Sequence, residues 1–153
     1  MIDVDMEFSS AIPADLAARY DEEARLIEVL VVDGQVWAKG IDIAGVVVVD
    51  LTDDRVVANF DVIAPRETWK VGLPIESVSG SSRSGTMRIP SDVIREGSIE
   101  LPVDIFRSTE SQIVQVLFGK PTGDSTLATV ALTQSCRAIM ESRRLLGFEL
   151  SLA

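Results

Sequence analysis

The sequence contains no histidine among its 153 residues. Histidine is the commonest general base, a usual zinc ligand and the partner of serine or cysteine in nucleophilic pairs. An enzyme of this composition would have to use carboxylates, one of its three lysines or an oxygen-ligated cation. No pattern in the sequence identifies a catalytic residue or a set of metal ligands. We expect no metal site and no cofactor.

Cysteine and long apolar runs are also scarce. The single cysteine, Cys136, has no second cysteine with which to form a disulfide, and we expect it to be a buried apolar residue. The sequence opens on the acidic stretch MIDVDMEF, which does not resemble a basic leader. Its longest aliphatic run, residues 46–49, is far shorter than the ~20 residues that cross a bilayer. We expect a cytoplasmic protein that does not bind membrane.

Negative charge is concentrated in one half of the chain. Residues 1–64 hold fourteen acids and four bases, whereas residues 65–153 hold ten of each, so the first half carries the whole net charge of −10. Such a field repels nucleic acid and favours a basic protein partner. An alternative explanation is that the bias reflects only the amino-acid composition of the source organism.

The pattern of apolar residues predicts a single α+β domain over residues 1–153 that is mainly β. We expect an antiparallel meander sheet, arranged as a sandwich or an open barrel, with one or two short helices. The acidic half, residues 1–64, and a neutral half, residues 86–153, are expected to be joined by an irregular connection over residues 65–85, which is rich in glycine, proline and serine.

Individual elements can be predicted within this class. Residues 26–63 read as a four-strand meander whose first hairpin turns at Asp33-Gly34, because this dipeptide accepts positive φ. Residues 3–8 read as an edge strand, with Val4, Met6 and Phe8 toward a core. A short helix is expected near residues 13–24. The segment 126–146 fits either a helix or strands, and we favour a strand to about residue 133 and a helix to 146, before a short final strand.

The stretch SGSSRSGTMRIP, residues 79–90, imitates a phosphate-binding loop but lacks its lysine. It also runs into an extended segment that ends at Pro90, whereas a phosphate loop opens a helix. A plain connection is the favoured interpretation. A basic binding surface formed by Arg83, Arg88 and Arg95 is the alternative.

Three groups of acidic residues are candidates for a binding or catalytic site. The acids of the first strand, Asp3, Asp5 and Glu7, fit an edge strand protected by charge. Asp53 and Asp54 belong to a turn, where aspartate bonds its own backbone. The strands that carry Asp42, Asp50 and Asp61 are able to bring two carboxylates together, as a hydrolase requires.

These observations favour a small protein-binding domain of the immunity, inhibitor or accessory-subunit type with an acidic contact surface. Trp69, expected to be exposed beside arginine, is typical of a binding hot spot. The first alternative is a hydrolase or isomerase that uses carboxylates or a divalent cation. The second is an architectural β-domain that forms homo-oligomers. The predicted partner-binding residues are Asp3, Asp5, Asp53, Asp54, Trp69 and Arg83.

Overall fold

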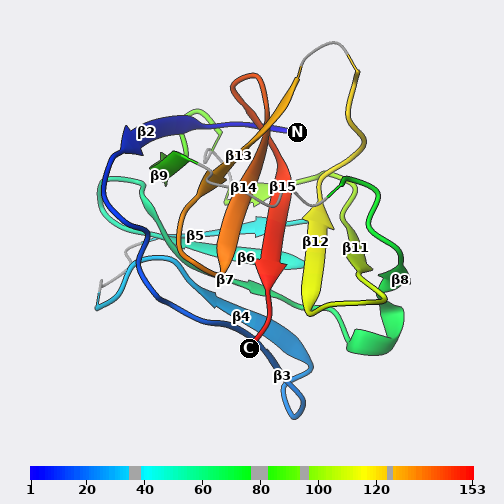
Figure 1. Ribbon diagram of the computed structural model, residues 1–153. Helices are drawn as coiled ribbons and strands as arrows, with labels where there is room; N and C mark the ends of the chain where they lie inside the picture. The colour runs from blue at the N-terminus through cyan, green and yellow to red at the C-terminus, as the bar shows by residue number, and fades with distance from the viewer. Residues whose placement is uncertain (35–38, 77–82, 94–96, 124–125) are drawn as a thin grey trace.

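Two β-sheets face each other in the computed structural model, and their strands cross at a steep angle (Figure 1). The structure describes residues 1–34, 39–76, 83–93, 97–123 and 126–153. Within these ranges the only helical element is a single 3-10 turn, Arg66–Thr68. The prediction of a mainly β fold is confirmed, whereas the expected short helices are absent from the described residues.

The larger sheet, sheet A, has the spatial order β2-β9-β13-β14-β15-β12-β11-β8, and β1 pairs with the start of β15. Its strands are β1 (Ile2–Asp3), β2 (Asp5–Ser9), β8 (Lys70–Val71), β9 (Arg83–Arg88), β11 (Asp104–Arg107), β12 (Ile113–Leu117), β13 (Leu127–Ala131), β14 (Cys136–Glu141) and β15 (Arg144–Ser151). The first two strands extend along residues 2–9, so the expected edge strand is present, and β2 ends the sheet.

The smaller sheet, sheet B, has the order β10-β5-β6-β7-β4-β3. Its strands are β3 (Ala18–Asp21), β4 (Leu26–Leu30), β5 (Lys39–Ile43), β6 (Val47–Leu51), β7 (Val57–Val62) and β10 (Ser98–Ile99). Strands β5, β6 and β7 form a meander, but β4 pairs with β7 and not with β5. This is the arrangement of a Greek key.

The predicted meander is therefore correct for three of its four strands, and the predicted β4–β5 hairpin is wrong. Gly34 has the positive φ of a turn, +67°. However, the chain that precedes it is paired with β3 and β7. Asp33 does not share this positive φ, and the turn dipeptide does not determine which strands become neighbours. Residues 35–38, which include Trp37, lie outside the described residues.

Both sheets are mixed, so the prediction of purely antiparallel pairing is also wrong. The pairs β10–β5, β11–β8 and β13–β9 are parallel. Each parallel pair contains one strand that belongs to, or adjoins, the long connections over residues 65–85 and 89–103. Long connections permit parallel pairing, whereas tight hairpins do not.

The helix expected near residues 13–24 is replaced by β3 and a turn. Ala18 is fully buried while its neighbour Arg19 is exposed, which is the alternation of a strand. The carboxylate of Asp21 accepts hydrogen bonds from the backbone N–H groups of Glu23 and Ala24, both at 2.9 Å. The acidic residues after β3 thus form a turn, and Pro13 lies in the irregular segment before β3 and not in the first turn of a helix.

The helix expected up to residue 146 is replaced by the β14–β15 hairpin, which turns at Ser142-Arg143. Most residues of its strands are buried on both faces of the sheet. Cys136 and Phe148 belong to the core between the sheets, whereas Ile139 and Leu146 belong to a second cluster on the outer face of sheet A. A strand covered on both sides loses its period of two, and its sequence then resembles a buried helix.

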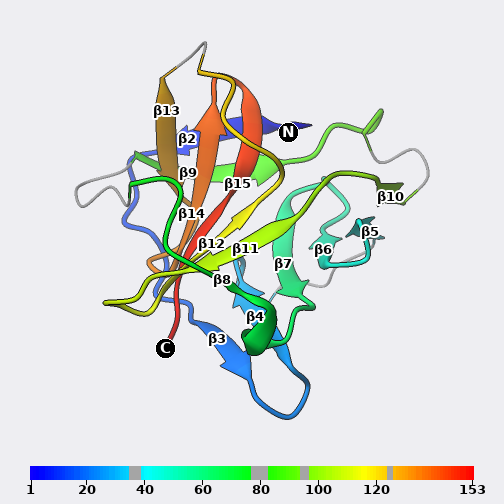
Figure 2. The ribbon, with the colours of Figure 1, turned by 90° about the vertical axis from the view of Figure 1, so that its right-hand side faces the viewer.

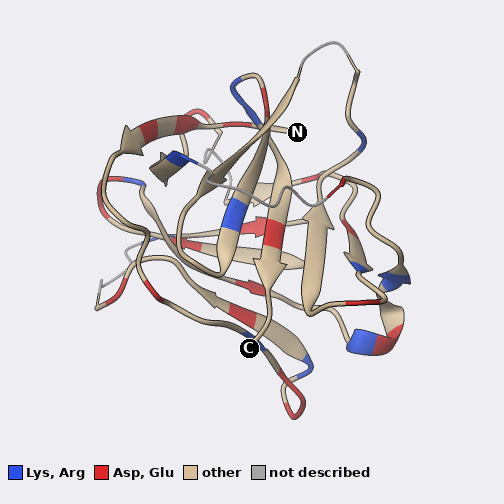
Figure 3. Cartoon of the chain, viewed as in Figure 1, with Lys and Arg blue, Asp and Glu red and all other residues tan. Residues whose placement is uncertain are grey.

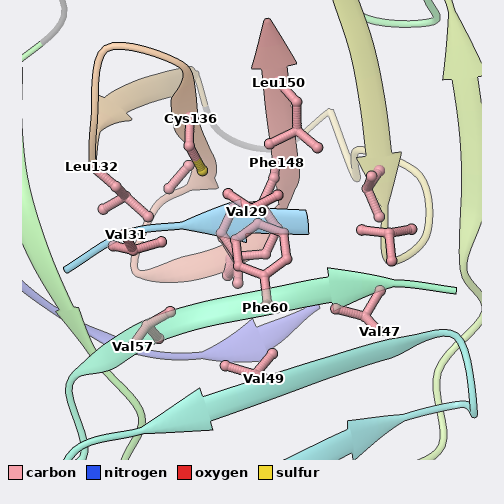
Figure 4. Close-up of a cluster of buried hydrophobic side chains, with 14 of the residues drawn as sticks. Val29, Val31, Val47, Val49, Val57, Phe60, Leu132, Cys136, Phe148 and Leu150 are labelled. Carbon is pink, nitrogen blue, oxygen red and sulfur yellow. The ribbon is translucent and has the colours of Figure 1, made fainter. Parts of the chain in front are cut away.

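The main core lies between the sheets and is built from alternate residues of both (Figure 4). Val29, Val49 and Phe60 of sheet B meet Phe148 and Leu150 of sheet A, and all are almost fully buried. Figure 2 shows the two layers from the side, with β13–β15 on one side and β5–β7 on the other. Burial of these aliphatic and aromatic side chains is the main stabilising contribution.

Two isolated bridges connect the sheets at opposite corners. Val56 pairs with Arg88, and Ala18 pairs with Leu152. These links hold β7 beside β9 and β3 beside the end of β15, so the sandwich is partly closed there. No helix in the described part of the chain is long and apolar enough to cross a bilayer.

Candidate functional site

The outward face of sheet B gathers side chains that strand alternation places away from the core. In β4 the buried Ile27 and Val29 flank Glu28, which therefore points outward. Glu28 lies directly opposite Asp61 of β7 on one side and opposite Arg19 of β3 on the other. Two carboxylates on adjacent strands are thus direct cross-strand neighbours, a placement that is unfavourable unless a cation is present.

The same face continues onto β6 and β5. Asp50 lies opposite Asn59, so it is a diagonal neighbour of Asp61. On β5, Asp42 shares this outward face, but its Oδ1 accepts a hydrogen bond of 2.6 Å from Gly45 N–H in the adjacent turn. Figure 3 shows acidic positions on several strands of sheet B. The structure therefore brings together two of the three predicted carboxylates, Asp50 and Asp61. The third, Asp42, is bound to the backbone of the β5–β6 turn.

Crowding of like charge alters the chemistry of this face. Partial burial raises the pKa of Asp61, and the nearby carboxylates of Glu28 and Asp50 raise it further. Burial also raises the pKa of Asp50. Arg19 offsets part of the charge through long hydrogen bonds to Glu28 Oε2, at 3.3 and 3.4 Å. A bound cation between the aspartates would be more favourable here than at isolated carboxylates.

A groove of about 590 Å³ follows these residues. The carboxamide Oδ1 of Asn59 is buried beside it, and in the described structure it has no hydrogen-bond partner. Leu30, on the same face, is 45% exposed. The groove is lined by Ala17, Arg19, Glu28, Val29, Leu30, Asp50, Asn59 and Asp61.

The acids predicted as contact residues lie elsewhere. Asp3 and Asp5 are exposed on the N-terminal strands of sheet A, and Asp3 forms an ion pair with Arg144 at 3.1 Å. Asp53 and Asp54 are exposed in the β6–β7 turn. The ion pair with Arg144 neutralises the charge of Asp3, and none of these four acids lines the groove on sheet B.

Trp69 is 7% exposed, contrary to its expected exposed position. Its Nε1 donates a hydrogen bond of 3.0 Å to the carbonyl oxygen of Ala64, and its ring packs edge-on against Tyr20 with 5.2 Å between centroids. The guanidinium of Arg66 covers the Tyr20 ring at 4.6 Å. Trp69 thus anchors the 3-10 turn and offers little surface to a partner.

The predicted basic surface is also divided. Arg83 is exposed and lies over the ring of Phe8, at 4.2 Å from its centroid. Arg88 forms an ion pair with Glu7 at 2.6 Å. Arg95 and residues 79–82 of the glycine-serine stretch lie outside the described residues. The segment that follows, β9, is extended as predicted.

Another hollow, of about 710 Å³, lies between the β3–β4 turn, the 3-10 turn and residues 107–114. Its charges are mutually compensated, because Arg66 pairs with Glu22 at 3.1 Å and Arg25 pairs with Glu67. We therefore place the candidate site on sheet B, where the carboxylates of the groove outnumber its one arginine.

Other buried polar groups have structural partners. Glu141 accepts hydrogen bonds from the backbone N–H and the hydroxyl of Thr122. Gln115 bonds the backbone of Ile75 and donates to Glu149 Oε2 at 3.0 Å. Cys136 is fully buried, as expected, and burial raises its pKa so that the reactive thiolate is disfavoured. In the described ranges no group of three or more potential ligands is arranged to hold a metal ion.

Glu28, Arg19 and Asn59 were not identified from the sequence as site residues. The usable signal was the alternation in LIEVL and VANFDV, which places Glu28, Asn59 and Asp61 on outward faces. The sequence does not indicate that β4 pairs with β7, and this pairing brings Glu28 next to Asp61. No protein-family model matches the chain, and no curated protein matches its sequence.

Proposed function

We propose that this protein is a binding domain, of the immunity, inhibitor or accessory-subunit type, that holds a basic protein partner on the outward face of sheet B. The observation that carries the proposal is the convergence of Glu28, Asp61 and Asp50 from three adjacent strands onto one groove. A lysine or arginine of the partner would lie between like charges that now repel one another.

The surroundings of the carboxylates suit a protein partner better than a free ion. Leu30 and Ile63, on the outward face of β4 and just beyond β7, are 45% and 47% exposed and provide apolar area beside the charges. Protein interfaces combine such apolar contacts with a charged rim that accelerates association. The contact surface thus differs from the one predicted around Asp3, Asp5, Asp53 and Asp54.

Binding of a labelled peptide of alternating lysine and serine residues tests this proposal. The affinity should decrease strongly between low salt and ~1 M salt, where the Debye length is ~3 Å. The triple variant Glu28→Gln, Asp50→Asn, Asp61→Asn should bind on the order of tenfold more weakly than the natural sequence at low salt.

A matched control variant separates the effect of the groove carboxylates from the effect of the protein's net charge. The variant Asp15→Asn, Glu23→Gln, Glu110→Gln removes the same net charge from exposed positions outside the groove. It should retain most of the affinity. If both triple variants weaken binding equally, the charge acts only through the net field and the proposed contact surface is wrong.

A carboxylate hydrolase is the second candidate, favoured by the raised pKa of Asp61 beside Glu28 and Asp50. Two carboxyl groups with different pKa values can divide the roles of acid and base. Hydrolysis of a panel of nitrophenyl glycosides, lost in Asp61→Asn, would support it. Peptide binding without any hydrolysis would favour the binding domain.

A further inference from the structure

A third hollow, of about 460 Å³, is lined by residues of sheet A and its turns. Strand β1 pairs with the start of β15, whereas β2 pairs with β9, so the chain crosses at Val4 from one part of the sheet to another. The hollow lies between this crossing and the β13–β14 pair. It is lined by Val4, Asp5, Met6, Phe8, Arg83, Ala128, Thr129, Val130, Met140, Ser142 and Arg143.

The floor of this hollow is apolar and continuous with the main core. Val4, Val130 and Met140 are 6%, 3% and 5% exposed and belong to the core cluster, against which Met6 also packs. Gly85 lies beside this floor, where the side chains of Met6 and Val130 leave no room for a Cβ, because one there would lie 2.9 and 2.8 Å from them. An apolar chain entering the hollow would therefore contact the core directly.

The rim of the hollow carries two arginines. Arg83 lies over Phe8, whose ring is 49% exposed, and Arg143 is exposed in the β14–β15 turn. Neither arginine forms an ion pair in the described part of the structure. Asp5 is the one acid in the lining, so the charged rim is net positive. The protein has a negative net charge, but the rim of this hollow is positive and its floor is apolar.

We propose that this hollow binds a single-chain anionic amphiphile, a free fatty acid. Its carboxylate would be held by one of the two rim arginines, Arg83 or Arg143, which the strand pairings place toward opposite ends of β13. Its chain would lie against Val4, Val130 and Met140. The volume is within the ~300–1,000 Å³ of small-molecule sites, which are mainly apolar with a few polar groups that fix orientation. An arginine selects an acid over the corresponding alcohol, because an uncharged head cannot form charge-assisted hydrogen bonds.

Isothermal titration calorimetry with octanoate tests the proposal on the full chain. Octanoate should bind with a stoichiometry of one, and hexanoate should bind on the order of tenfold more weakly because two fewer methylenes are buried. Octanol should bind more weakly than octanoate, and octylamine more weakly still. Tighter binding of octylamine would mean that Asp5 determines the site and would overturn the anionic class, as would the absence of octanoate binding.

Paired variants identify the location of the bound acid. The double variant Arg83→Gln, Arg143→Gln should weaken octanoate about tenfold and leave octanol unchanged. The control Arg107→Gln, Lys120→Gln removes equal charge from exposed positions outside the hollow and should have no such effect. Equal losses in both double variants would overturn the proposed head-group contacts.

A third substitution tests the apolar part of the hollow. Ala128→Trp should block both octanoate and octanol, whereas Ala24→Trp, at an exposed turn position, should block neither. Octanoate binding that is unchanged in Ala128→Trp would overturn the location. If Ala128→Trp does not fold, the charge variants decide the question, since both arginines are exposed.

Discussion

The rings of Phe60 and Phe148 stack across the interior, with their centroids 4.4 Å apart and their planes inclined by 25°. One ring comes from β7 of sheet B and the other from β15 of sheet A, so this contact joins the two layers (Figure 4). Phe148 also meets Phe118 edge-on at 6.0 Å. In a chain with only 5% aromatic residues, these three rings form the centre of the core.

Phe148→Ala should therefore lower the free energy of unfolding by about 3–5 kcal/mol, through lost burial and the cavity left behind. Urea denaturation followed by circular dichroism measures this change. Phe8→Ala is the control, because Phe8 is 49% exposed and its truncation should cost well under ~1 kcal/mol. A similar loss at both positions would show that Phe148 does not have the central role assigned to it.

At Gly147 the backbone of β15 lies very close to the backbone of β12. A Cβ at this position would lie 2.1 Å from Val116 O and 2.9 Å from Leu117 Cα on the paired strand. Because both atoms belong to the backbone of β12, Gly147→Ala must separate β12 from β15, and we expect a loss of more than ~3 kcal/mol of stability.

Gly40→Ala serves as the comparison for this glycine. At Gly40 a Cβ would meet Asp50 Oδ1 at an ordinary contact distance of 3.5 Å, so the loss there should stay below ~1 kcal/mol. Urea denaturation of the two variants side by side decides between the two glycines. Equal stabilities would contradict the described register of β12 and β15.

Ala44 has φ of +54° and Gly45 has φ of +71°, and Val46 N–H donates to Ile43 O at 3.0 Å. This is a hairpin turn in which both central residues are left-handed. An alanine in this conformation costs about 1 kcal/mol, whereas asparagine tolerates it. Ala44→Asn should raise the urea midpoint by an amount equivalent to ~0.5–1 kcal/mol. The same change at Ala24, which has no positive φ, should give no gain.

The sequence determined strand positions far better than strand neighbours. Runs of apolar and β-branched residues between turn signals located β4, β6, β7 and β13. Pairing of β4 with β7 depends on contacts between residues about 30 positions apart, which no local pattern records. The candidate site exists only because of that pairing, so Glu28 was not recognised as its member.

The burial of β14, β15 and Trp69 could not be predicted from the local sequence. Where strands are covered on both faces, as in β14 and β15, the period of two disappears, and a helix was expected there. Trp69 was expected at the surface because its neighbours are polar and irregular. Its burial results from Tyr20 and Ala64, and Tyr20 is distant from it in the sequence.

The last prediction concerns the pH dependence of stability at Asp61. Its folded-state pKa is raised above the ordinary value of 3.8 by burial, by Glu28 and by Asp50. Between 3.8 and the raised value, the folded state binds more protons than the unfolded state, so stability decreases as the pH rises through this window. At neutral pH the ionised Asp61 therefore destabilises the fold.

Asp61→Asn should accordingly be more stable than the natural sequence at pH ~7, and the difference should disappear as the pH falls below the ordinary aspartate pKa of about 4. Urea midpoints measured across this range provide the test. Asp15→Asn removes one negative charge outside the groove and shows how much of the gain comes from net charge alone. A variant at Asp61 that is less stable at neutral pH, or equally altered at all pH values, would show that the carboxylates of Glu28, Asp50 and Asp61 do not repel one another on the folded sheet. The peptide-binding surface would then lose its electrostatic basis.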